Sequence, residues 1–143
     1  MSTRQKGDLC ELFVLTQLVK RGYTIALPYG RQPGWDLLVE VNGKWEKWQV
    51  KMAAFRAPYK RHDKTLPYAP STRSVGPKRI QTKYQKGDFD YLLAVDPERE
   101  TIWKIPADIA IPKRSIPLRT NTFLWHPDPK EIDPSKLRLQ ALI

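Results

Sequence analysis

The sequence predicts an α/β domain, in which helices flank a central β-sheet and one long basic segment leaves that sheet. Three observations predict this fold. An apolar helical segment near the N-terminus precedes two adjacent strands, and two more strands follow at 90–95 and 101–105. The 143 residues suffice for one domain with a hydrophobic core, so we expect a single domain over 1–143. The 13 prolines argue against a helical bundle, because proline breaks long helices.

Residues 3–21 are expected to form the first helix. Ser2 and Gln5 have the spacing of a capping box, which marks a helix start. From Leu9 to Val19 the segment is apolar around nearly its whole circumference, which predicts a buried helix. Glu11 is the only charged residue in this stretch, and a buried carboxylate is costly unless it is paired or bound to a metal.

Two strands at 35–41 and 45–53 are predicted to form a hairpin, after a short strand at 24–28. Asn42 and Gly43 separate the two strands, and this dipeptide is the strongest short signal for a hairpin turn. The hairpin places the start of the first strand beside the end of the second. Polar residues at that end of the sheet are therefore expected to lie together.

The strand at 90–95 is continuously apolar, which predicts that it is buried, and 101–105 is its antiparallel partner. A proline opens a predicted helical turn at 106–110. The rest of the chain holds short apolar pieces between prolines, at 122–125 and 137–143. We expect the last piece to dock as an edge strand or to form an oligomer contact.

Positive charge is concentrated between the two pairs of strands. The chain has a net charge of +10, and residues 56–88 hold nine basic and two acidic residues, a net charge of +7. Residues 54–88 show no sustained period and are interrupted by prolines, so we expect an excursion from the sheet, with a second hairpin and a short helix at 78–85. A solvated basic loop is the alternative interpretation.

The composition of this excursion favours contact with DNA. Its basic residues alternate with aromatic residues, which anchor a loop or contact bases, at Phe55, Tyr59, Tyr68 and Tyr84. Arginine and lysine reach phosphates or guanine edges. The predicted DNA-binding residues, including one in the loop before the hairpin, are Arg31, Arg56, Lys60, Arg61, Lys64, Arg73, Lys78, Arg79 and Lys83.

The remaining composition narrows the class of protein. Cys10 is the only cysteine, which excludes an internal disulfide and a cysteine zinc cluster. No apolar run follows the N-terminus, so we expect no signal peptide and a cytoplasmic, bacterial-type location in a reducing compartment. The longest apolar run, 91–95, is too short to span a bilayer, so no membrane partner is expected.

Three polar residues stand on the predicted hairpin where apolar ones are usual. Asp36 opens the first strand, and Gln49 and Lys51 are two apart on the second, so they share a face. Hydrolysis of a phosphodiester needs an activated water and neutralisation of the charge on the phosphoryl oxygens. One or two hard divalent ions held by oxygen ligands meet both needs.

The predicted ligands are the carboxylate of Asp36, the side-chain oxygen of Gln49, the backbone carbonyl of Val50 and the carboxylate of Glu11. Lys51 is predicted to orient the attacking water or to neutralise charge on the reacting phosphate. No phosphate-binding loop of the P-loop or dinucleotide type is present. The pattern therefore predicts a metal-dependent phosphodiesterase site.

The motifs KGDLCELFVLTQLVKRGY, GWDLLVEV and WQVK carry Glu11, Asp36 and Lys51, and their arrangement resembles the PD-(D/E)xK nuclease superfamily over residues 6–106. Within it the chain is most similar to the compact homing endonucleases encoded in bacterial group I introns. Archaeal Holliday-junction resolvases share the same core. The resemblance implies a restriction-endonuclease-like core with a mixed sheet, Mg²⁺ as cofactor with Mn²⁺ as a substitute, and double-stranded DNA as substrate. It also implies catalytic roles for Glu11, Asp36, Gln49 and Lys51.

The sequence departs from the superfamily pattern twice. Trp35 replaces a loosely required proline, and Gln49 replaces the usual acid, which removes one negative charge. The intron-encoded branch is similar in using Gln here. Three functions stay open: a homing-type endonuclease that makes a double-strand break, a junction-resolving nuclease, and a DNA-binding module without catalysis. One site cuts one strand, so we expect at least a homodimer, and the resemblance implies a tetramer.

Overall fold

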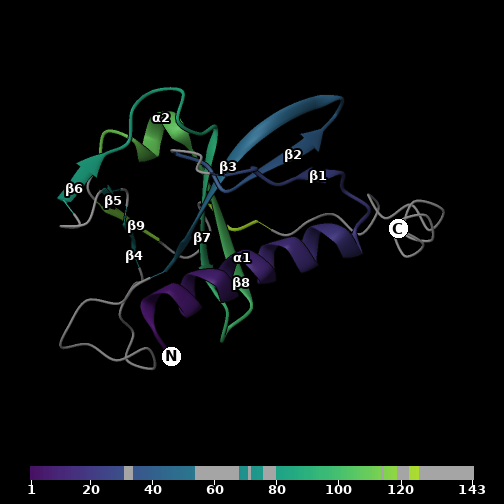
Figure 1. Ribbon diagram of the computed structural model, residues 1–143, viewed down its shortest axis with the longest axis horizontal. Helices are drawn as coiled ribbons and strands as arrows, with labels where there is room; N and C mark the ends of the chain where they lie inside the picture. Colours follow the sequence, from purple (N-terminus) through teal and green to yellow (C-terminus); the bar gives the residue numbers. More distant parts are fainter. Residues whose placement is uncertain are drawn as a thin grey trace.

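The computed structural model describes residues 1–30, 34–53, 68–70, 72–75, 80–113, 115–118 and 123–125. In these ranges the chain folds around a five-stranded sheet with the strand order β1-β2-β3-β7-β8 (Figure 1). The central neighbours β3 and β7 are parallel, and the other neighbours are antiparallel. The predicted α/β fold with a mixed sheet is therefore confirmed. The strands are β1 (Ile25–Ala26), β2 (Leu37–Val41), β3 (Lys44–Met52), β7 (Tyr91–Asp96) and β8 (Thr101–Pro106).

Helix α1 (Thr3–Lys20) begins as the sequence predicts. The hydroxyl of Ser2 accepts a hydrogen bond from the backbone N–H of Gln5 (3.2 Å), and the backbone N–H of Ser2 donates to the Gln5 side chain (2.8 Å). The helix crosses β3 and β7 on one face of the sheet (Figure 1). No helix in the described ranges is long and apolar enough to cross a membrane.

The predicted burial of α1 on all sides is wrong. Only one face of the helix meets the sheet, through Cys10, Val14 and Leu18. Leu9 and Leu12 are 42% and 60% exposed, and they lie on the opposite side. The apolar sequence exceeds what one helix–sheet contact can cover, because a sheet buries only one face of a helix laid upon it.

Each face of the sheet carries its own hydrophobic cluster. Trp48 and Val50 of β3 point towards α1 and pack with Leu93 and Val95 of β7. Alternate residues point to the opposite face, where the second cluster includes helix α2 (Ala107–Ala110) and Phe89. Because β3 is covered on both faces, a side chain from either face at its end is shielded from bulk water.

The hairpin turn and the shorter strands follow the sequence with one exception. Asn42 and Gly43 have φ of 52° and 79°, the left-handed values of a two-residue hairpin turn. Strands β5 (Thr72–Val75) and β6 (Ile80–Lys83) pair antiparallel, which confirms a second hairpin. The short helix predicted at 78–85 is wrong, because strand pairing with β5 takes up Ile80–Lys83. Strand β4 (Tyr68–Pro70) pairs with β9 (Ser115–Pro117).

Residues 123–125 pair with the edge strand β8 through backbone hydrogen bonds, and the Lys104 side chain of that strand lies among three aromatic rings. The Lys104 ammonium lies 4.2 Å from the ring centroid of Tyr91, 4.6 Å from that of Trp48 and 5.9 Å from that of Trp125. It also pairs with Glu46 at 3.6 Å, where both side chains are largely buried. The predicted apolar piece at 122–125 thus docks in its described part, 123–125. The last piece, 137–143, lies outside the described residues.

Replacing Lys104 with methionine should lower the free energy of unfolding by about 2 kcal/mol, since cation–π attraction is lost and Glu46 keeps an uncompensated charge. Denaturant titration measures this change. Lys113→Met is the matched control, because Lys113 is exposed and makes the same change of charge. Equal stability of the two variants would show that the aromatic cage contributes nothing.

Candidate active site

Asp36 is fixed at the end of the hairpin by two hydrogen bonds to β3. Its backbone N–H donates to the carbonyl of Trp48 (2.8 Å), which extends the β2–β3 ladder by one residue. Its carboxylate Oδ2 accepts from the backbone N–H of Val50 (2.8 Å). The side chain therefore lies against the segment that carries Gln49 and Lys51, as the hairpin predicts.

Gln49 and Lys51 occupy successive positions on one face of β3. They stand opposite Leu92 and Ala94 of β7, which both belong to the cluster on the face away from α1. Gln49 is 9% exposed, and its amide Nε2 donates to the Val50 carbonyl oxygen (3.3 Å). The Gln49 side chain thus lies beside the Val50 carbonyl, with its amide nitrogen turned towards that oxygen.

Glu11 reaches the same place from α1. Its carboxyl group hydrogen-bonds that of Asp36, and burial together with the negative charges of Asp36 and Asp8 raises the pKa of Glu11 to about 7. Burial also raises the pKa of Asp36, against the opposing effects of the Val50 N–H and the Lys51 charge. The two acids resist simultaneous ionisation, and Glu11 holds the shared proton below its pKa of about 7.

Lys51 completes the cluster of charges. Burial lowers the pKa of its ammonium, and the charge of Asp36 opposes this shift. The ammonium lies 5.5 Å from the ring centroid of Tyr84. Sequence reasoning predicted Tyr84 only as a loop anchor or a base contact and missed its place beside Lys51. No local pattern signals this contact, because Tyr84 arrives from the far end of the excursion.

The donor set suits a hard divalent cation. Glu11 and Asp36 supply carboxylate oxygens, and Gln49 and Val50 supply neutral oxygens, which are the ligands that Mg²⁺ accepts. A cation would also relieve the repulsion that makes the two acids share a proton. In the described part of the chain, no three histidine, cysteine, aspartate or glutamate residues gather to hold a metal. At position 49, where the family pattern usually has an acid, the neutral Gln49 leaves Glu11 and Asp36 as the paired carboxylates of the cluster.

Two of the nine predicted DNA-binding residues lie in described strands. Arg73 and Lys83 lie in β5 and β6, where the backbone alone is described. The others lie outside the described residues: Arg31, Arg56, Lys60, Arg61, Lys64, Lys78 and Arg79.

Comparison with known families agrees with this geometry. The family model described as PD-(D/E)XK endonuclease matches residues 1–126. The chain belongs to this family. It is therefore a nuclease of the PD-(D/E)XK type, and its sheet and helices form the restriction-endonuclease-like α/β fold of the predicted class.

Solved structures support the fold of this PD-(D/E)XK endonuclease. The bacterial homing endonuclease I-Ssp6803I aligns with a TM-score of 0.68 at 24% identity, over 99% of this chain and 97% of that chain. A match to MepB, at 12% identity over 96% of this chain and 95% of that one, has a TM-score of 0.37, too low to indicate a common fold. A search of the curated proteins found no match.

Proposed function

We propose that this PD-(D/E)XK endonuclease is a homing-type enzyme, which hydrolyses both strands of double-stranded DNA at a specific site with Mg²⁺, or Mn²⁺ in its place. One observation carries the proposal: α1, the start of β2 and the end of β3 bring Glu11, Asp36 and Lys51 into one cluster. The likeness in fold to a homing endonuclease is consistent with it.

The oxygen ligands and the lysine of the proposed site have different roles in hydrolysis. Glu11, Asp36, Gln49 and Val50 would hold the metal, and the bound ion supplies a lowered pKa for a water and positive charge for the phosphoryl oxygens. Lys51 directs its ammonium towards the charge that develops in the transition state. Asp36 keeps that ammonium near by its own negative charge, while the Val50 N–H fixes the carboxylate.

Two copies of this site are needed for a double-strand break, because each site breaks one phosphodiester. The active unit is thus at least a homodimer that reads a roughly palindromic target, or a tetramer. The basic excursion over 54–88 supplies the DNA surface, since it holds most of the chain's excess positive charge. Sequence reading by this surface separates the homing type from a nuclease that recognises DNA shape.

Cleavage of a supercoiled plasmid library with randomised inserts tests the proposal. With Mg²⁺ we expect linear plasmids cut at one recurring sequence, and chelation of the metal should leave the plasmids intact. Lys51→Ala protein serves as the matched control for a contaminating nuclease. Linear products without a recurring sequence would overturn site specificity, and nicked circles alone would overturn the double-strand break.

Gln49 is the one feature that favours the alternative of a DNA-binding module without catalysis. A neutral ligand weakens the hold on a divalent ion relative to a third carboxylate. Intact supercoiled plasmid at protein concentrations that bind the DNA would establish this alternative. Preferential cutting of a four-way junction in competition with linear duplex would instead show a junction-resolving nuclease.

A further inference from the structure

Residues 84–90 contact β3 and the backbone just before β2, which together carry Asp36, Gln49 and Lys51. They follow β6 directly and lead into β7. The backbone N–H of Lys47 donates to the Asp90 carboxylate (2.8 Å), and the backbone N–H of Asp90 donates to the Lys47 carbonyl (2.8 Å). The end of this segment is therefore bonded to β3 two residues before Gln49.

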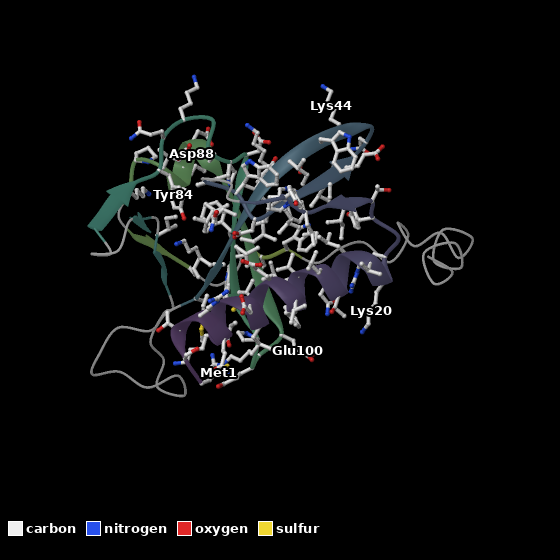
Figure 2. All side chains as sticks on the ribbon, in the orientation of Figure 1. Met1, Lys20, Lys44, Tyr84, Asp88 and Glu100 are labelled. Atoms are coloured by element: carbon white, nitrogen blue, oxygen red, sulfur yellow. The ribbon has the colours of Figure 1, made fainter. Side chains whose placement is uncertain are left out.

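The same segment touches the backbone just before Asp36. A Cβ atom placed on Gly34 would stand 2.6 Å from the Cβ of Asp88, and Gly34 has a φ of +93°. Only glycine suits this position, because both the space and the backbone conformation exclude a side chain. The labelled Asp88 and Tyr84 lie near each other in the upper left of Figure 2, away from α1.

Tyr84 is the member of this segment that meets a charged residue of the site. Its side chain is 3% exposed and stacks edge-to-face on Phe89, with ring centroids 5.0 Å apart. Its ring also lies 5.5 Å from the Lys51 ammonium, within the range of a cation–π contact. The long, flexible Lys51 side chain thus has an aromatic wall on one side and the negative charge of Asp36 to attract it.

We propose that Tyr84 is a positioning residue for cleavage, whose ring holds the Lys51 ammonium in the orientation that serves the reacting phosphate. The inference rests on the proposed function, since Lys51 must act on a phosphodiester. A ring wall restricts the rotamers of a lysine without neutralising its charge, and a misplaced catalytic group reduces rate far more than it reduces binding. Because Tyr84 immediately follows β6, it also joins the β5–β6 hairpin to the site.

The alternative is that Tyr84 only stabilises the hydrophobic core and has no role in cleavage. Phe89 provides the matched control for this alternative, because it packs in the same buried cluster and contacts Tyr84. Tyr84→Leu and Phe89→Leu each remove one aromatic ring from that cluster. Tyr84→Phe keeps the ring face and removes the hydroxyl alone.

Single-turnover cleavage of the selected target, DNA affinity and thermal denaturation should be measured for all three variants. Tyr84→Leu should lower the cleavage rate constant by about 10-fold or more with an unchanged Kd for DNA, the size of one lost cation–π contact. Tyr84→Phe should restore most of that rate. Phe89→Leu should lower the melting temperature while its cleavage rate constant stays near that of the wild type.

Equal losses of rate in Tyr84→Leu and Phe89→Leu would overturn the positioning role and leave Tyr84 as a core residue. A loss confined to DNA affinity would also overturn it. If the wild-type protein does not cut DNA, the proposed function fails, and the positioning role of Tyr84 fails with it. If the wild type cuts DNA, the comparison of the variants tests the positioning role alone.

Discussion

Asp36→Asn should abolish cleavage, with a loss of at least about 10²–10³-fold in the rate constant, while the affinity for DNA survives. Asparagine still accepts the hydrogen bond from the Val50 N–H, so the hairpin end keeps its shape. The change removes the negative charge that would bind a metal ion and attract Lys51. Single-turnover cleavage and a binding titration separate the two effects.

Asp90→Asn is the matched control for this substitution. Asp90 likewise accepts a hydrogen bond from a backbone N–H of β3, that of Lys47, which lies four residues before Lys51. The Asp90→Asn protein should cut DNA at nearly the wild-type rate. A pair of variants that lose activity together would mean that the effect is structural, and an active Asp36→Asn protein would show that the site is assigned wrongly.

In the absence of metal, the protein should become less stable as pH rises from about 4.5 towards 8. The folded state keeps a proton on Glu11 up to a pKa of about 7, whereas the unfolded chain releases it near the ordinary glutamate pKa of 4.5. A raised carboxyl pKa therefore gives stability that is present at low pH and is lost as pH rises through this window. The loss should be about 1–2 kcal/mol, because solvent screens a half-exposed carboxyl.

Urea unfolding at several pH values tests this linkage. Glu11→Gln should flatten the dependence, and Glu40→Gln, the same change on strand β2, should keep it. Added Mg²⁺ should stabilise the wild type more as pH rises, because metal binding must displace the proton from Glu11. Stability that stays constant between pH 5 and 8 in the wild type without metal would contradict the shared proton.

The sequence predicted those parts of the fold that local signals decide. The capping box of Ser2 and Gln5 set the start of α1, and Asn42-Gly43 set the hairpin that aligns Asp36 with β3. The cluster of Glu11, Asp36 and Lys51 followed from this alignment and from the family resemblance.

The features that sequence reasoning predicted wrongly or missed depend on contacts between distant parts of the chain. The apolar circumference of α1 suggested full burial, yet the described sheet covers one side only and leaves Leu12 exposed. Ile80–Lys83 has enough helical character to suggest a turn of helix, yet pairing with β5 makes it a strand. The approach of Tyr84 to Lys51 depends on the path of the whole excursion, which no local period encodes.

The parallel pairing of β3 and β7 has a consequence for protein engineering. Two adjacent parallel strands must be joined by a crossover, and here the crossover carries the basic excursion. Its two ends are tied to the sheet, by the Ala53 N–H to the Val95 carbonyl (2.8 Å) and by the Asp90 N–H to the Lys47 carbonyl (2.8 Å). Sequence libraries over 54–83 leave Tyr84 and the residues of the proposed site unchanged, and they test whether the proposed DNA surface can be redirected to new targets.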